Sequence, residues 1–306
     1  MAQLTEATRA PGARHSAPPQ RRTRRRIKAG GAGGQQHGGP FAYAILILAT
    51  AVSLFPLYWT VVAASHTDHD IISPPTPLLP GSHLIENLKI VWDQVDMTQA
   101  LVNSTIVAGT VALSTVLFAT LAGFAFAKLE FRGRNALLTL VVATMTVPPQ
   151  LTVIPLYQII TNVGWVGHLQ SVILPSLVAA FGVFFMRQFL SEALPIELIE
   201  AARVDGAHSL RIIWHVVFPV ARPAMAVLGM LVFVQSWNDF FWPFIALSQQ
   251  NPTVQVALEG VGSGNHQIDH AVVVTAALVA TVPLLAVFAL LGKQIVGGIT
   301  AGAVKS

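Results

Sequence analysis

Residues 101–127 read LVNSTIVAGTVALSTVLFATLAGFAFA and contain no Asp, Glu, Lys or Arg. The stretch lies between Asp96 and Lys128. As a helix that rises about 1.5 Å per residue, it is long enough to cross roughly 30 Å of hydrocarbon. A surface helix of a soluble protein would carry a charged face, and this stretch has none. It therefore predicts a helix that spans a membrane.

The composition extends this interpretation to most of the chain. Charged residues make up 10% of the 306 residues, against about 25% in an average soluble domain, and apolar residues make up 53%. A chain so poor in charge cannot cover an ordinary globular surface, which excludes a typical cytosolic enzyme. Cys is absent, so the chain has no disulfide, no thiolate metal ligand and no Cys nucleophile.

Five further stretches with at most one charge predict five more spans. In chain order, the six predicted spans are Phe41–Ala63, Leu101–Ala127, Leu137–Ile160, Ser171–Met186, Pro223–Leu247 and Ala271–Leu291. The first follows a basic flank, as a signal peptide would, but its apolar run exceeds a typical signal core of about 7–15 residues, so we interpret it as an uncleaved helix. The predicted fold class is all-α, a polytopic membrane protein with six transmembrane helices.

The basic residues divide unequally between the two sides that these spans define. All but one of the 18 Lys and Arg residues fall in the N-terminal segment, the loops 127–135 and 187–222, and the C-terminal tail. Lys89 alone falls on the other side. Because loops rich in Lys and Arg stay in the cytoplasm, we expect both termini to be cytoplasmic.

Residues 1–40 differ from the remainder of the chain. They combine a basic cluster with a glycine-rich run and hold too little apolar surface to form a core, which predicts a disordered cytoplasmic extension. The basic residues are Arg9, Arg14, Arg21, Arg22, Arg24, Arg25, Arg26 and Lys28. Such a cluster can bind nucleic acid, but beside a membrane helix it fits a cytoplasmic anchor, so we expect contact with membrane lipid and no nucleic-acid partner. Residues 41–306 then form the transmembrane domain.

The longest cytoplasmic loop, residues 191–222, is patterned as two helices. Asp205-Gly206 ends the first helix at a bend, where glycine can take a positive φ. An apolar stripe that begins near Ser209 predicts a second helix, which Pro219 would stop. An amphipathic hairpin of this kind either lies on lipid or docks into a groove of a partner, and the pattern alone leaves both open.

The same loop resembles the EAA motif of the membrane subunits of ATP-binding-cassette importers, in particular those of the carbohydrate-importing subgroup. The residues that carry the resemblance are Glu200, Ala201, Ala202, Asp205, Gly206, Ala207 and Pro219. Val147-Pro148-Pro149-Gln150, Ser236–Phe240 and the tail Thr300–Lys305 are similar to further segments of maltose-transporter G-type subunits. The resemblance covers residues 41–306.

The resemblance implies a type I importer permease in a bacterial cell membrane, where it forms half of a sugar pathway. Its partners would be a second, homologous permease subunit, two copies of an ATP-binding subunit and an extracellular sugar-binding protein or lipoprotein. The EAA loop would couple the ATPase to the pathway. The chain has no Gly-x-x-x-x-Gly-Lys-Ser/Thr phosphate loop, so we expect a non-catalytic subunit without a cofactor of its own, ATP and Mg being bound by the partner.

Candidate residues of the substrate pathway are those that can stack on a sugar ring or bond to its hydroxyl groups. They are Gln150, Trp237, Asn238, Asp239 and Phe240. Asp239 is the single acid inside a predicted span, about 24 Å along a helix from Pro223 and hence near the outer surface. A structural or gating role, a hydrogen bond to sugar and proton transfer stay open for it, and Trp237 also suits an interfacial aromatic belt.

Two other classes of function make different demands on the sequence. An intramembrane protease would need Gly-x-Ser-x-Gly or His-Glu-x-x-His in a span; neither occurs, although Gly262-Ser263-Gly264 lies in a loop. An ion-coupled secondary transporter would need buried acids near the midplane, and Asp239 is the one candidate. His266 and His270 are too few ligands for zinc. The sequence therefore favours a transport subunit.

Overall fold

The computed structural model of the chain describes residues 39–261 and 268–303. The chain divides into two compact units, Met1–Ala51 and Val52–Ser306. The described part of the first unit, residues 39–51, holds the start of helix α1 (Pro40–Ala64), and the other residues of α1 belong to the second unit. Residues 1–38 of the predicted disordered extension and the loop Gly262–Gly264 fall outside the described residues, so both statements stay predictions there, whereas Pro40 begins α1.

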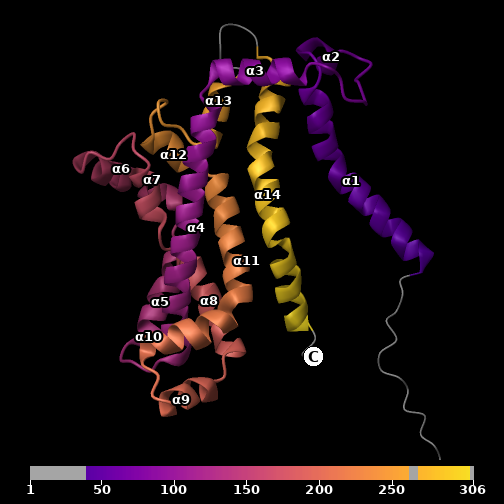
Figure 1. The fold of residues 1–306 in the computed structure, drawn as a ribbon. Coiled ribbons are helices and arrows are strands. Elements are labelled where there is room, and N and C mark those ends of the chain that lie inside the picture. Colours follow the sequence, from indigo (N-terminus) through magenta and orange to yellow (C-terminus); the bar gives the residue numbers. More distant parts are fainter. Residues whose placement is uncertain (1–38, 262–267, 304–306) are drawn as a thin grey trace, which may run out of the picture. The chain divides into compact units, whose positions relative to one another are not determined.

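Every regular element in the described ranges is helical, which confirms the all-α prediction (Figure 1). Five helical segments are long and apolar enough to cross a membrane, and a sixth is present if one bent pair is a single span. The five are α1, α4 (Met97–Lys128), the segment Gln170–Ala193, the segment Ser209–Trp237, and the part His270–Leu290 of α14 (His270–Ala303). Four of the predicted spans thus correspond to α1, α4, Gln170–Ala193 and α14.

The remaining helices lie between these segments or subdivide them. They are α2 (Asp68–Ile72), α3 (Leu84–Gln94), α5 (Arg134–Thr144), the 3-10 turn η1 (Pro149–Thr152), α6 (Val153–Asn162), α7 (Gln170–Ile173), the 3-10 turn η2 (Leu174–Ser176), α8 (Ala180–Ala193), α9 (Ile196–Val204), α10 (Ser209–Ile212), the π-helical turn Ile213–Val217, α11 (Phe218–Trp237), α12 (Phe241–Ala246) and α13 (Val254–Gly260).

Helix α4 is the helix against which α8 and α11 pack (Figure 1). At its first turn the Asp96 carboxylate accepts a hydrogen bond from the backbone N–H of Gln99, and at its last the Lys128 ammonium donates to the Ser191 carbonyl. A Cβ added to Gly123 would lie 2.7 Å from the backbone nitrogen of Arg187 in α8. Glycine at this position lets the backbones of α4 and α8 approach closely, as small residues do where membrane helices cross.

The predicted span Leu137–Ile160 is not one straight helix. Helix α5 ends at Thr144, and η1 and α6 continue at an angle of 93° to it. The break lies at Pro148 and Pro149, where two residues lack the N–H that a helix needs and the first is driven into an extended conformation, with ψ 128°. The consecutive prolines therefore redirect the chain.

The expectation that Pro219 stops the second hairpin helix is wrong. Residues Ser209–Trp237 form one continuous helical path, in which α10, the π-helical turn and α11 follow each other directly. A proline removes one hydrogen bond to the preceding turn, and the wider π-helical turn shifts the bonding register just before Pro219. The predicted span Pro223–Leu247 consequently starts earlier, at Ser209, and ends earlier, at Trp237.

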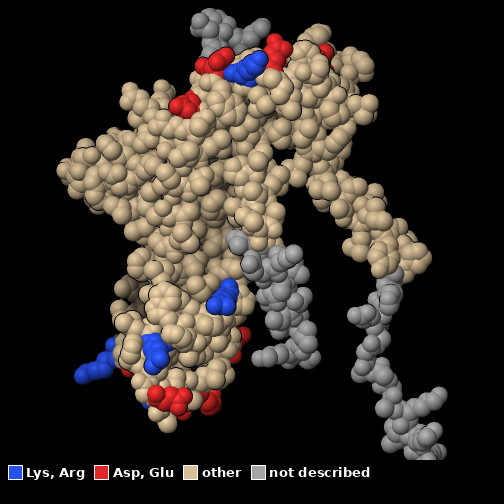
Figure 2. Space-filling view, viewed as in Figure 1, with Lys and Arg blue, Asp and Glu red and all other residues tan. Residues whose placement is uncertain are grey.

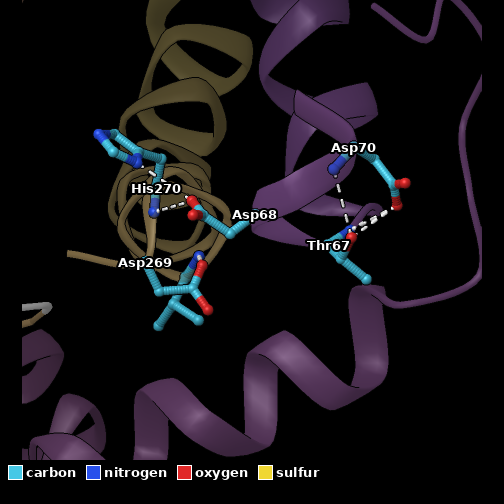
Figure 3. A network of polar contacts seen from close by, with 6 residues as sticks. Thr67, Asp68, Asp70, Asp269 and His270 are labelled. Atoms are coloured by element: carbon cyan, nitrogen blue, oxygen red, sulfur yellow. Dashed lines mark hydrogen bonds and ion pairs between the residues drawn. The ribbon is translucent and has the colours of Figure 1, made fainter. Parts of the chain in front are cut away.

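Polar contacts join α2 to the first turn of α14 (Figure 3). One oxygen of Asp68 accepts hydrogen bonds from the backbone N–H and from Nδ1 of His270, at 2.7 and 3.0 Å. Thr67 and Asp70 form a capping box at the start of α2, and the hydrogen bonds from Thr67 lower the pKa of Asp70. These contacts fasten the segment after α1 to the last span.

Charged side chains gather at two ends of the second unit. Figure 2 shows them over α3 at one end and over α9 at the other, with uncharged surface between. A hydrocarbon layer requires such a band, because a charge placed in it is costly. The distribution of charged side chains and the lengths of the helices both indicate a protein that crosses the membrane several times.

Candidate translocation site and coupling hairpin

A cavity of about 500 Å³ lies where three interruptions of the helices meet beside α4. The interruptions are those between α5 and η1, between η2 and α8, and between α11 and α12. Lining residues lie in or directly beside each interruption: Pro149 and Gln150, Ser176 and Ala179, and Asp239 respectively. Non-helical backbone at membrane depth is tolerated where it is buried in protein or lines a water-filled cavity. The convergence of three such segments marks this cavity as the candidate translocation site.

The polar lining of the cavity consists of hydroxyl and amide groups with one carboxylate. These side chains belong to Thr115, Gln150, Thr152, Ser176, Gln235, Ser236 and Asp239. Phe241 and Trp242 add aromatic rings. Hydroxyls and amides both donate and accept hydrogen bonds, so the lining can bind a solute that carries many hydroxyl groups.

Two side-chain hydrogen bonds hold the interrupted segments in place. The buried Thr115 hydroxyl in α4 donates to the carbonyl of Leu177 at 3.3 Å, beside the second interruption. The Trp242 indole N–H in α12 donates to the carbonyl of Ser171 in α7 at 3.0 Å. The carbonyl groups released where the helices end are thus bonded by neighbouring elements, which makes the irregular backbone stable inside the protein.

Asp239 lies in the turn between α11 and α12, just after the span and not within it. Its carboxylate faces the backbone N–H groups of Phe241 and Trp242 and is about half buried. At the end of α11, the side chain and the backbone N–H of Asn238 both donate to the carbonyl of Val234, at 2.8 and 3.1 Å. Asp239 therefore lies just before the short α12 and borders the cavity.

The five predicted pathway residues separate into two groups. Gln150 and Asp239 line the cavity, whereas Trp237, Asn238 and Phe240 are not among its lining residues. Trp237 is 1% exposed and donates to the carbonyl of Ala280, so it packs α11 against α14. Phe240 stacks on Phe244 in α12.

Sequence reasoning missed several lining residues that a helical period would have found. Val232, Gln235, Ser236 and Asp239 recur at the spacing of one helix face, and three of the four are polar within an otherwise apolar stretch. Thr115 carries a weaker signal, because the same span also holds Thr105, Thr110 and Thr120.

The hairpin between α9 and α10 is closed by a Schellman motif. The N–H of Gly206 donates to the carbonyl of Arg203, and the N–H of Ala207 donates to the carbonyl of Ala202, at 3.0 and 2.9 Å. Gly206 has φ +79°, which confirms the predicted positive φ. The bend is therefore short and bonded to itself, as a rigid connection requires.

One face of the hairpin is buried and the other is free. Leu194, Ile199, Ile212 and Val217 belong to the hydrophobic core, and Ala202 and Ala207 pack against it. Glu200, Ala201, Asp205 and Gly206 are exposed, as is Pro219 farther along the chain. Val204 at the tip is 88% exposed. The exposed face of the hairpin is therefore accessible to another surface.

Comparisons with known proteins agree with this geometry. Residues 115–300 match the family described as binding-protein-dependent transport system inner membrane component. The chain is 29% identical over 267 residues to the sn-glycerol-3-phosphate transport system permease protein UgpE of Escherichia coli (strain K12), and equally to that of Shigella flexneri serotype 5b (strain 8401). Each match covers 85% of this chain and 95% of the relative.

A solved structure shows the same fold. The chain matches, with a TM-score of 0.70, one chain of a bacterial ABC transporter involved in the import of the acidic polysaccharide alginate. The sequence identity is 20%, and the match covers 83% of this chain and 95% of that chain.

The family match spans more than half of the chain, from the middle of α4 into α14, and includes both the hairpin and most of the cavity. The prediction of a multi-pass permease that works with a further permease, an ATPase and a binding protein is confirmed at that level. The chain belongs to the family of binding-protein-dependent transport system inner membrane components.

Proposed function

We propose that the chain is one of two homologous permease subunits of an ATP-driven sugar importer, in which it forms half of the pathway. One observation carries the proposal: the second hairpin helix and α11 are a single helical path from Ser209 to Trp237. Its first end lies in the hairpin, and its last two turns supply Val232, Gln235 and Ser236 to the cavity. At about 1.5 Å per residue the path is roughly 43 Å long, so a displacement of the hairpin reaches the cavity through a stiff element.

A sugar as the transported solute is supported by the cavity lining and by the relatives. Amides, hydroxyls and aromatic rings together suit a ligand rich in hydroxyl groups. The relatives are named for a glycerol phosphate and for a polysaccharide, both of them hydroxylated compounds. ATP and Mg are bound by two copies of a partner subunit, and an extracellular binding protein delivers the solute.

The orientation follows from the basic residues of the hairpin end, so both termini are cytoplasmic. The native chain has no Cys, which allows single-Cys labelling. A Cys at Ser191, beside the hairpin, is expected to resist an impermeant maleimide in intact cells, and a Cys at Thr98, at the start of α4, to react. Labelling of the Ser191 position in intact cells would contradict the orientation.

The coupling role of the hairpin is tested by Gly206→Val. A Cβ at Gly206 meets nothing within 4 Å, so the substitution acts through the positive φ alone, at a cost of about 1–3 kcal/mol. We expect normal membrane insertion but loss of sugar uptake, with the ATPase either absent from the purified complex or hydrolysing ATP without transport. Glu200→Lys, which reverses an exposed charge without altering the bend, should likewise weaken co-purification.

Gly164→Val is the matched control. Gly164 has φ +70° and equally open surroundings, but it lies outside the hairpin, between α6 and α7. The control variant should keep uptake and ATPase binding. If Gly206→Val and Glu200→Lys also keep both, the hairpin is not the coupling element.

A further inference from the structure

The cavity differs in charge from what the named relatives would suggest. Among its described lining residues, Asp239 is the one ionisable side chain, and none is Lys, Arg or His. The relatives are named for sn-glycerol 3-phosphate and for an acidic polysaccharide, both of which are anions. A site for an anion is expected to offer a cation or a cluster of N–H donors, since phosphate and carboxylate groups only accept hydrogen bonds when ionised.

The donors of the irregular backbone supply such a site only in part. The backbone N–H groups of Phe241 and Trp242 face the carboxylate of Asp239 itself. The first residues after the other interruptions include Pro149, which has no N–H. Helix α8 starts beside the lining residue Ala179 without a side-chain cap, so its first N–H groups remain as donors near the cavity. A helix start carries about half a positive charge, which is less than the full negative charge of the Asp239 carboxylate.

Asp239 has acceptor positions left for a solute. An ionised carboxylate offers about four lone-pair positions, more than the two nearby backbone N–H groups of Phe241 and Trp242 can use. A hydroxyl group of a solute can donate to the remaining positions, whereas an anionic group can only repel the carboxylate. The amides of Gln150 and Gln235 can serve further hydroxyl groups, and the ring of Trp242 offers an apolar face.

We propose that this half of the pathway admits neutral, hydroxyl-rich solutes and disfavours anionic ones, with Asp239 as the specificity-determining residue. The proposal rests on the function proposed above and deepens it. A neutral sugar or polyol keeps all its hydroxyl donors, loses less hydration energy on entry than an anion does, and meets no like charge. A uronic acid or sugar phosphate of the same skeleton meets the fixed carboxylate in a partly dehydrated site, where charge repulsion is stronger than in water.

The test uses the complete importer with its partner permease, ATPase and binding protein, reconstituted in proteoliposomes. ATP-dependent uptake is measured for radiolabelled pairs that differ in charge: glucose and glucuronate, galactose and galacturonate, glycerol and sn-glycerol 3-phosphate, and a neutral and an acidic disaccharide. We expect uptake of the neutral member of the transported pair to exceed that of the anionic member at least tenfold.

The variant Asp239→Asn distinguishes the selectivity of the permease from that of the binding protein. The preference of the binding protein is common to both importers, so a change in the uptake ratio reports the permease alone. We expect Asp239→Asn to reduce the neutral-to-anionic ratio about fivefold or more. Asp93→Asn, which removes an exposed acid from α3, should leave the ratio unchanged.

A second measurement tests the permease without the binding protein, because a binding protein that binds no anions would hide the selectivity of the permease. Equilibrium dialysis of the same pairs against the purified permease–ATPase complex, without binding protein, should show binding of the neutral sugar that weakens in Asp239→Asn. Absence of neutral binding, preferential anion binding, or an unchanged ratio in Asp239→Asn would overturn the charge selection. A wild-type importer without ATP-dependent uptake of any solute would instead overturn the proposed function.

Discussion

The hairpin and the cavity end their helices in opposite ways. At the hairpin, Gly206 turns the chain, the released carbonyls are bonded within the bend itself, and the next helix starts at once. At the cavity, the helix ends are held by side chains from other elements, such as Thr115 and Trp242. The hairpin bend is stiff because of hydrogen bonds between residues close in sequence. The helix ends at the cavity are instead held by other elements, so the cavity lining depends on how the helices pack together.

The largest expected effect tests the anchorage of the hairpin. Ile199 in α9 is 2% exposed and belongs to the core, so Ile199→Ala should lower the free energy of unfolding by about 2–5 kcal/mol and loosen α9 from the core. Val204→Ala, at an 88% exposed position of the same helix, is the control and should leave stability unchanged. The measurement is thermal unfolding of the purified complex together with ATPase co-purification. Equal melting temperatures for the two variants would show that the hairpin is not anchored as described.

The next effect concerns the scaffold that carries both regions. Gly123→Val places side-chain atoms where the backbone of α8 lies, and separating α4 from α8 should cost about 1–3 kcal/mol. Gly109→Val, in the same helix but with nothing within 4 Å of the added Cβ, is the control. Size-exclusion profiles and melting temperatures in detergent compare the two. If Gly123→Val is as stable as Gly109→Val, the close crossing of α4 and α8 is not required.

A smaller effect should appear at the rim of the cavity. Trp242→Phe removes the indole N–H that bonds the Ser171 carbonyl, at a cost of about 1 kcal/mol. Because the bond ties α12 to α7, we expect reduced uptake with a normal amount of assembled complex. Trp214→Phe, on the exposed face of the hairpin end, loses no such bond and should keep its uptake. A reversed order of uptake would contradict a cavity held by its neighbours.

The smallest stability effect is expected for a residue that serves the solute alone. Gln150 is exposed in the cavity, so Gln150→Leu should change the melting temperature little while it raises the solute concentration needed for half-maximal uptake. Uptake kinetics at several solute concentrations give the measurement. A large loss of stability with unchanged kinetics would place Gln150 in the scaffold and not in the pathway.

The proline positions show that the same residue type can have different effects on a helix, which limits prediction from the sequence. Pro148 and Pro149 lie within a stretch that was predicted as one span, and the helix there is broken by 93°. Pro219 was expected to stop a helix, and the helix runs through it. Both sites lack one or more N–H donors, so their difference comes from the turns around them: a π-helical turn precedes Pro219, and no such turn precedes Pro148.

The sequence by itself determined the features that depend on local chemistry. The spans follow from the cost of placing charge in hydrocarbon, and the bend at Gly206 follows from the freedom of glycine at positive φ. The tertiary structure alone decided which polar residues meet. Thr115, Gln150, Ser176 and Asp239 come from four separate segments and line one cavity, while Trp237 turns away into the contact with α14. Local hydrogen bonding and solvation can be read from neighbouring residues, but a cavity arises where helices fail to fill space between them, and that depends on packing across the whole bundle.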